Sequence, residues 1–76
     1  MKKYVIIIEK TKDNYSAYSP DLPGCVATGQ TTSEVTKNIT TAIEMHIEGL
    51  IEDKLPIPKP QTMVDYVEVN YHSLEA

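Results

Sequence analysis

Three carboxylates and one cysteine are the side chains of this sequence that could do chemistry. Glu9, Asp21 and Asp65 could work as paired carboxylates in a hydrolytic reaction only if they converged in one cleft. They fall in separate predicted elements, so we expect each to be exposed. Cys25 could act as a nucleophile only beside a cation or a histidine, and its neighbours supply neither. We expect Cys25 to be a small buried residue at the start of a strand.

The remaining chemical motifs are also missing. Glu44 and Glu48 lie two positions from His46, so they do not share its face of a helix and cannot complete a metal site with it. The sequence has no glycine-rich phosphate loop, no Cys/His metal spacing and no Ser-His-Asp signature. It therefore predicts a protein that is not an enzyme, without catalytic, cofactor-binding or metal-binding residues.

The charge composition argues against direct nucleic-acid binding. The net charge is −4, and the chain contains no arginine, whose guanidinium suits phosphate groups and guanine edges. We expect neither DNA nor RNA to bind this chain alone. Beyond Glu44, acids outnumber lysines, which predicts either a basic partner or an ordinary solvated face. Four lysines cluster near the first predicted strand: Lys2, Lys3, Lys10 and Lys12.

Length and cysteine usage limit the compartment and the assembly. The apolar run at residues 5–8 ends at Glu9, which is too short for a signal peptide or a membrane span. One cysteine allows no intrachain disulfide and fits the reducing cytoplasm. Residues 1–76 form a single domain that buries only about 60% of its unfolded surface. We therefore expect a homo-oligomer, a dimer or a tetramer, with no membrane contact.

Extended patterns dominate the first third of the chain. Residues 3–10 are rich in β-branched and aromatic side chains, and residues 15–19 resume an extended pattern after a short polar turn, which predicts an antiparallel hairpin. Prolines must then end the ladder, and glycine lets the chain re-enter a strand at residues 25–28. Residues 18–25 are either a structural corner or a recognition loop that presents Asp21 and Leu22 beside Tyr18. The marker residues of this corner are Tyr18, Pro20, Pro23, Gly24 and Cys25.

A capping box predicts where the helix begins. Gly29 turns the chain, and Thr31 followed by Glu34 fits a box that starts a helix over residues 32–53. Apolar residues then recur at steps of three and four along one face. Gly49 lies in this stripe, and we expect a close approach of the helix backbone to the sheet there. The opposite side carries three acids: Glu44, Glu48 and Glu52.

The last third predicts a connector and one more strand. Alternating prolines in residues 55–61 exclude a helix, and residues 63–71 alternate as a strand does. A right-handed crossover places this fourth strand parallel to the first. The expected fold class is α+β, in the order β-β-β-α-β, with sheet order 3-2-1-4 and the helix on one face. The other face has no covering layer, so we expect a partner surface there or at the fourth strand.

The corner, the cap and the helix exit together resemble the HicB-like antitoxin family. The matching features are residues 18–25, Gly29, the Thr31 cap, and residues 46–53 running into Leu55-Pro56-Ile57-Pro58. The resemblance covers residues 3–70 and implies a partial RNase H-like fold. It also implies a prokaryotic type II toxin-antitoxin system, in which the antitoxin covers the RNA-cutting surface of a small basic HicA-like mRNA interferase.

The resemblance implies protein binding and no catalysis. Members often carry a C-terminal DNA-binding segment, and this sequence stops at Ala76, so we expect either a stand-alone short form or a DNA-binding function that is absent or supplied by another chain. On the basis of charge, we expect the partner-binding residues to be Asp21, Glu44, Glu48 and Glu52. The alternative function is an orphan homo-oligomeric scaffold or regulatory domain that has no toxin partner.

Overall fold

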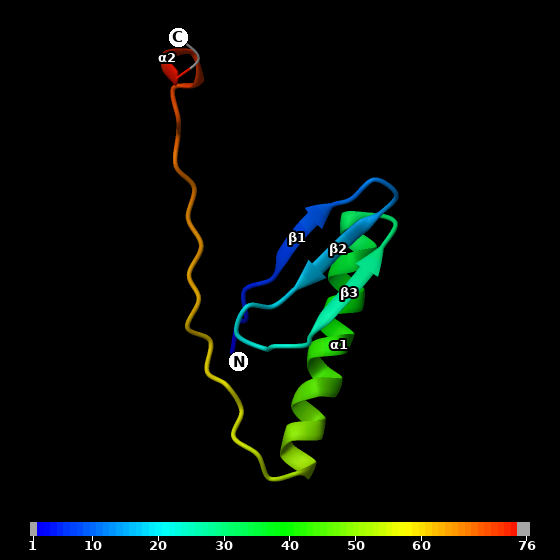
Figure 1. Ribbon diagram of the computed structural model, residues 1–76. Helices are drawn as coiled ribbons and strands as arrows, with labels where there is room; N and C mark the ends of the chain where they lie inside the picture. The colour runs from blue at the N-terminus through cyan, green and yellow to red at the C-terminus, as the bar shows by residue number, and fades with distance from the viewer. Residues whose placement is uncertain (1, 75–76) are drawn as a thin grey trace.

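A computed structural model describes residues 2–74 as a small sheet covered by one long helix (Figure 1). The elements follow in the order β1 (Ile7–Lys10), β2 (Tyr15–Tyr18), β3 (Val26–Gly29), α1 (Thr32–Glu52) and α2 (Tyr71–Leu74). Both strand pairs are antiparallel and the sheet order is β1-β2-β3. The predicted α+β class, with a three-stranded meander followed by a helix, is confirmed.

The strand register decides which face of the sheet meets α1. Ala17 in β2 lies opposite Ile8 in β1 and Ala27 in β3. Ala17 is buried, so this row points toward the helix. The next row, in which Tyr18 lies opposite Ile7 and Val26, therefore points to the other face. That second face is not covered by any element of residues 2–74.

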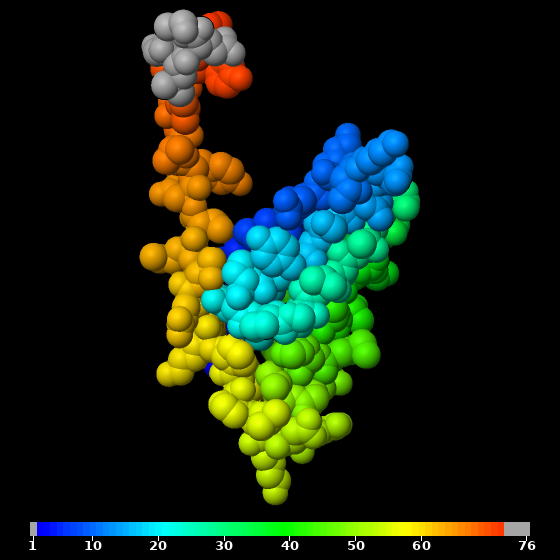
Figure 2. All heavy atoms as spheres, in the orientation of Figure 1, coloured from blue at the N-terminus to red at the C-terminus, as the bar shows by residue number. Residues whose placement is uncertain are grey.

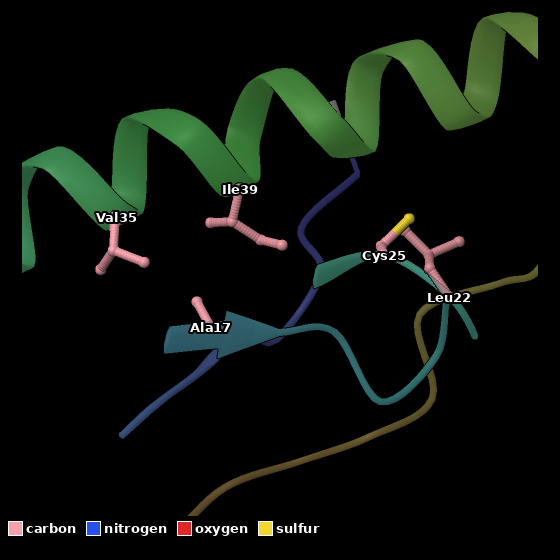
Figure 3. Packing of buried hydrophobic residues seen from close by; sticks show 5 residues of the cluster. All are labelled: Ala17, Leu22, Cys25, Val35 and Ile39. Atoms are coloured by element: carbon pink, nitrogen blue, oxygen red, sulfur yellow. The ribbon is translucent and has the colours of Figure 1, made fainter. Parts of the chain in front are cut away.

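The core is small and lies under the first half of α1. Val35 and Ile39 descend from the helix toward Ala17, while Leu22 and Cys25 close one end from the chain that links β2 to β3 (Figure 3). These five side chains are all buried. The second half of α1 contributes only half-buried residues, because the helix continues past the edge of the sheet (Figure 1). Stability therefore depends on few contacts.

The N-terminus of α1 is fixed by local hydrogen bonds. The Glu34 amide donates to the Thr31 hydroxyl oxygen at 3.0 Å, and the Glu34 carboxylate accepts from the Gln30 amide at 3.2 Å. Gly29 lies against this first turn: a Cβ atom there would be 2.6 Å from the Val35 amide nitrogen. The close approach between sheet and helix is therefore at Gly29.

The close approach expected at Gly49 is not present. A Cβ atom at Gly49 would meet nothing within 4 Å, because this part of α1 has already passed beyond the sheet. The helix then ends in a Schellman motif, with the Leu55 amide donating to the Leu50 carbonyl at 2.9 Å and the Lys54 amide to the Ile51 carbonyl at 3.1 Å. Lys54 takes the left-handed conformation of this motif, with φ of 55°.

Over residues 2–74, the structure does not show the expected fourth strand. Residues 63–70 lie in no strand, and α2 begins at Tyr71, so none of the described residues fills the position beside β1. The alternating pattern suits a strand, but a strand also needs a partner edge. Thr62 is hydrogen-bonded to Asp21, and the chain that follows projects away from the body (Figure 1). The strand expected over residues 3–10 is likewise shorter. It starts at Ile7, because β2 ends at Tyr18 and Pro20 cannot donate to a ladder.

Candidate partner-binding surfaces

Two consecutive β-turns build the corner between β2 and β3. The Leu22 amide donates to the Ser19 carbonyl at 3.2 Å, and the Cys25 amide donates to the Leu22 carbonyl at 3.1 Å. Each turn has proline at its second position, where a fixed φ is favourable. Gly24 is the third residue of the second turn, and its φ of +89° is the one that a type II turn requires.

The corner buries most of what it carries. Leu22 is 0% exposed, so the structure does not present it for recognition. Cys25 is enclosed as well, and this burial raises the pKa of its thiol. Ser19 is also buried, and its hydroxyl donates to the Val5 carbonyl at 3.0 Å, which ties the segment before β1 to the corner. These residues therefore have structural roles.

Asp21 holds a distant segment of its own chain. Its Oδ2 accepts from the amides of Gln61 and Thr62 at 3.1 and 3.0 Å, and its Oδ1 accepts from the Thr62 hydroxyl at 2.8 Å. The hydrogen bonds from Thr62 and then Gln61 hold the pKa of Asp21 below its usual 3.8, and partial burial opposes them. The carboxylate expected to contact a partner thus accepts three hydrogen bonds from two residues of its own chain.

The acidic residues of α1 do form one exposed row. Glu44, Glu48 and Glu52 succeed each other at steps of four, and all three side chains are exposed. Beside Glu44 lies an open hollow of about 450 Å³ between the helix and the segment before β1. Its other lining residues are mostly apolar: Lys2, Tyr4, Thr40, Ile43, Ile47 and Ile57. A basic partner with an apolar side chain would suit this combination.

The uncovered sheet face offers a second surface. Tyr18 and Val26 are exposed there and line a shallow hollow of about 510 Å³ with Ser16 and Thr28. The open face is expected from the sequence, whereas these residues are not among the expected partner contacts. The signal was available in the alternation of residues 15–18, where Ser16 and Tyr18 share a side.

The described residues offer binding surfaces and little else. Across residues 2–74, no three His, Cys, Asp or Glu side chains gather closely enough to hold a metal ion. In the same stretch, no helix has the length and apolar character needed to cross a bilayer. The surfaces that stand out are the acidic row with its apolar hollow and the open face of the sheet.

The described residues thus form a three-stranded α+β domain with two open surfaces. The comparison with known families is more specific. The chain belongs to the HicB-like antitoxin family: the model of that family, described as the HicB-like antitoxin of bacterial toxin-antitoxin systems, matches residues 4–73. The resemblance stated from the sequence is confirmed.

Relatives and a solved structure agree with this assignment. The chain is 44% identical over 64 residues to a 14.9 kDa protein from the rep-hol intergenic region of Haemophilus phage HP1, and spans 48% of that protein's length. It is 44% identical to a UPF0150 protein of Synechocystis sp., with 80% of this chain and 78% of the relative covered. A UPF0150 protein of Helicobacter pylori is 33% identical, with 86% of this chain and 92% of the relative covered.

The structural neighbour comes from a complex. A chain of the HicA3 and HicB3 toxin-antitoxin complex superposes with a TM-score of 0.67 and is 37% identical, with 79% of this chain and 70% of that chain covered. The fold and the family therefore agree.

Proposed function

We propose that this protein is the antitoxin of a type II toxin-antitoxin pair. It binds a small basic HicA-like mRNA interferase and covers the RNA-binding and RNA-cutting surface of that toxin. The observation that carries the proposal is the family match over residues 4–73. The likeness to a chain of the HicA3 and HicB3 complex supports it, because that structure is a toxin-antitoxin assembly.

The acidic row of α1 is the proposed contact for the toxin. Glu44, Glu48 and Glu52 are exposed and would complement a basic surface, which raises the association rate and the specificity more than the affinity. The apolar hollow beside Glu44 supplies a desolvated centre for the same contact. Asp21 is part of the proposal only as the residue that positions the connector near this region.

The proposal excludes catalysis by this chain. The protein acts by occupying a surface, in the cytoplasm, as a homo-oligomer, and binds neither DNA nor RNA through residues 2–74. A net charge of −4 without arginine supports this part. A partial RNase H-like arrangement with a fourth strand remains part of the proposed fold.

Co-expression tests the proposal. The protein is produced together with the basic protein encoded beside it, and growth and complex formation are both measured. We expect the neighbour alone to arrest growth, and the pair to grow and to co-purify. Unchanged growth arrest with no recovered complex would refute the antitoxin function. A genome without such a neighbour would instead favour the orphan scaffold.

A further inference from the structure

Residues 63–69, here called the tail, carry an exposed apolar surface. Met63 is 91% exposed, Tyr66 95% and Val67 84%, although the segment contains neither glycine nor proline. A linker does not need such residues, whereas a strand does. Figure 2 shows this part of the chain in orange, standing clear of the body. Its side chains therefore lack the packing that their composition suits.

The segment that precedes the tail is anchored to the body. Asp21 holds Gln61 and Thr62, and the Tyr4 hydroxyl donates to the Pro58 carbonyl at 2.6 Å. The chain is thus anchored up to Thr62 and free to project after it, and the molecule is 56 Å long in its greatest extent. At about 3.3 Å per residue, seven extended residues reach roughly 23 Å from the anchor.

The free edge of β1 has the backbone groups and the nearby positive charge that would suit pairing with the acidic tail. Within residues 2–74, β1 pairs with β2 alone, so its other side presents unpaired backbone groups. The residues before and after it are rich in exposed lysine, whereas the tail carries Asp65 and Glu68 and no lysine. The opposite edge, β3, has no charged residue between Val26 and Gly29. Charge therefore favours β1 as the acceptor.

We infer that the tail is a strand donated to a second copy of this chain. Residues 63–69 of one protomer pair with the β1 edge of the other, and the exchange is reciprocal. Because each chain has one strand to give and one edge to receive, two copies satisfy both and the assembly closes as a symmetric dimer. The fourth strand expected beside β1 is thereby supplied by the partner.

Proline substitutions test the pairing. Successive N–H groups point to opposite edges of a strand, so either Val67→Pro or Glu68→Pro must remove a ladder donor. Neither position is packed on the body, so both variants should fold. We expect light scattering to give a dimer for the unmodified chain and a monomer for at least one variant. Two variants that both remain dimeric would overturn the inference while leaving self-association intact.

Cross-linking between different chains tests the exchange itself. One chain carries Val67→Cys, a second, isotope-labelled chain carries Glu9→Cys, and a short bismaleimide links exposed thiols. We expect a product that contains one chain of each kind, and none when Lys37→Cys on α1 replaces Glu9→Cys. A chain that carries both Val67→Cys and Glu9→Cys and links only within a monomer would overturn the inference in favour of pairing within one chain.

Hydrogen exchange separates a second copy from a toxin. The inference rests on the self-association proposed above but not on toxin binding, so this measurement uses the chain alone. We expect the amides of Tyr66 to Val69 to be protected at high protein concentration and to exchange faster on dilution. Protection that arises only when a toxin is added would show that the toxin is the acceptor, and would overturn the exchange.

Discussion

Asp21 and Thr62 are joined by two hydrogen bonds although they are 41 positions apart in the chain. The Thr62 amide donates to Oδ2 at 3.0 Å and the Thr62 hydroxyl to Oδ1 at 2.8 Å. Both bonds are stronger when the carboxylate is ionised, because each oxygen then accepts as part of a charged group. The corner between β2 and β3 therefore determines where the connector after α1 is held.

Asp21→Asn should loosen the connector. The pKa of Asp21 is lowered in the folded protein, so its contribution to stability is fully present above the usual value of 3.8 and is lost as the pH falls through the lower folded pKa. We expect faster amide exchange at Gln61 and Thr62 in the variant. In the unmodified chain, the same release should occur only in acid.

Thr62→Val is the matched control for this prediction. It removes the hydroxyl bond to Asp21 and keeps the amide bond, so the exchange rate at Thr62 should fall between those of the unmodified chain and Asp21→Asn. Equal exchange in all three proteins would show that Asp21 does not hold the connector.

Gly29→Ala should destabilise the fold by about 1–3 kcal/mol, the usual cost of overpacking a fixed site. The added Cβ would lie 2.6 Å from the nitrogen and 2.9 Å from the Cα of Val35, and both are backbone atoms. Urea unfolding at one fixed protein concentration measures the change. Thr28→Ala, at the exposed neighbouring position, should change the free energy of unfolding by less than about 0.5 kcal/mol.

Gly49→Ala should change the free energy of unfolding in the opposite direction and stabilise the protein. Nothing lies within 4 Å of a Cβ atom at this position, so alanine adds helix propensity of about 1 kcal/mol without a clash. The melting temperature should rise. A fall would indicate that another chain packs against this turn of α1 and needs the space.

Lys54→Gly should also stabilise the protein, by about 1 kcal/mol, because a side chain in the left-handed region is strained. Lys54 has φ of 55° and is the only non-glycine residue among residues 2–74 with positive φ. Lys59→Gly removes the same charge without relieving strain, so it should leave the stability unchanged or lower it. If both variants stabilise the protein equally, the increase in stability comes from the loss of the lysine charge and not from relief of backbone strain.

The effect of the acidic row on toxin association can be distinguished from the effect of net charge. Glu44→Gln with Glu48→Gln should slow association with the toxin by about tenfold at low ionic strength, and the difference should shrink as salt is added. The control, Glu9→Gln with Asp13→Asn, removes two charges from the hairpin and should have a smaller effect. Similar rates for both double variants would mean that the row is not the contact.

Elements with local signals could be predicted from the sequence. Thr31 and Glu34 place the start of α1 at Thr32, as expected, and the helix end differs by one residue. The prolines and Gly24 likewise indicate where β2 stops and β3 starts. These signals act over a few residues, where turn geometry and capping decide the conformation.

Features that depend on distant contacts could not be predicted. From the sequence, either Gly29 or Gly49 could allow the helix backbone to approach the sheet closely. Only the position of α1 over the sheet shows that the close approach is at Gly29. From the sequence, Asp21 cannot be distinguished from an exposed acid that binds a partner. Its role in holding the connector is evident only from its hydrogen bond to Thr62, which is distant in the chain. The tail has the alternation of a strand, but periodicity does not identify the chain that pairs with it.

The buried thiol of Cys25 can report on local opening of the corner between β2 and β3. It is 4% exposed and its raised pKa disfavours the reactive thiolate, so alkylation has to wait until the two turns open. The rate of alkylation thus measures how often the corner opens locally, and no engineered label is needed. Since the same corner anchors Thr62, a ligand that steadies the connector should slow the labelling of a cysteine it never touches.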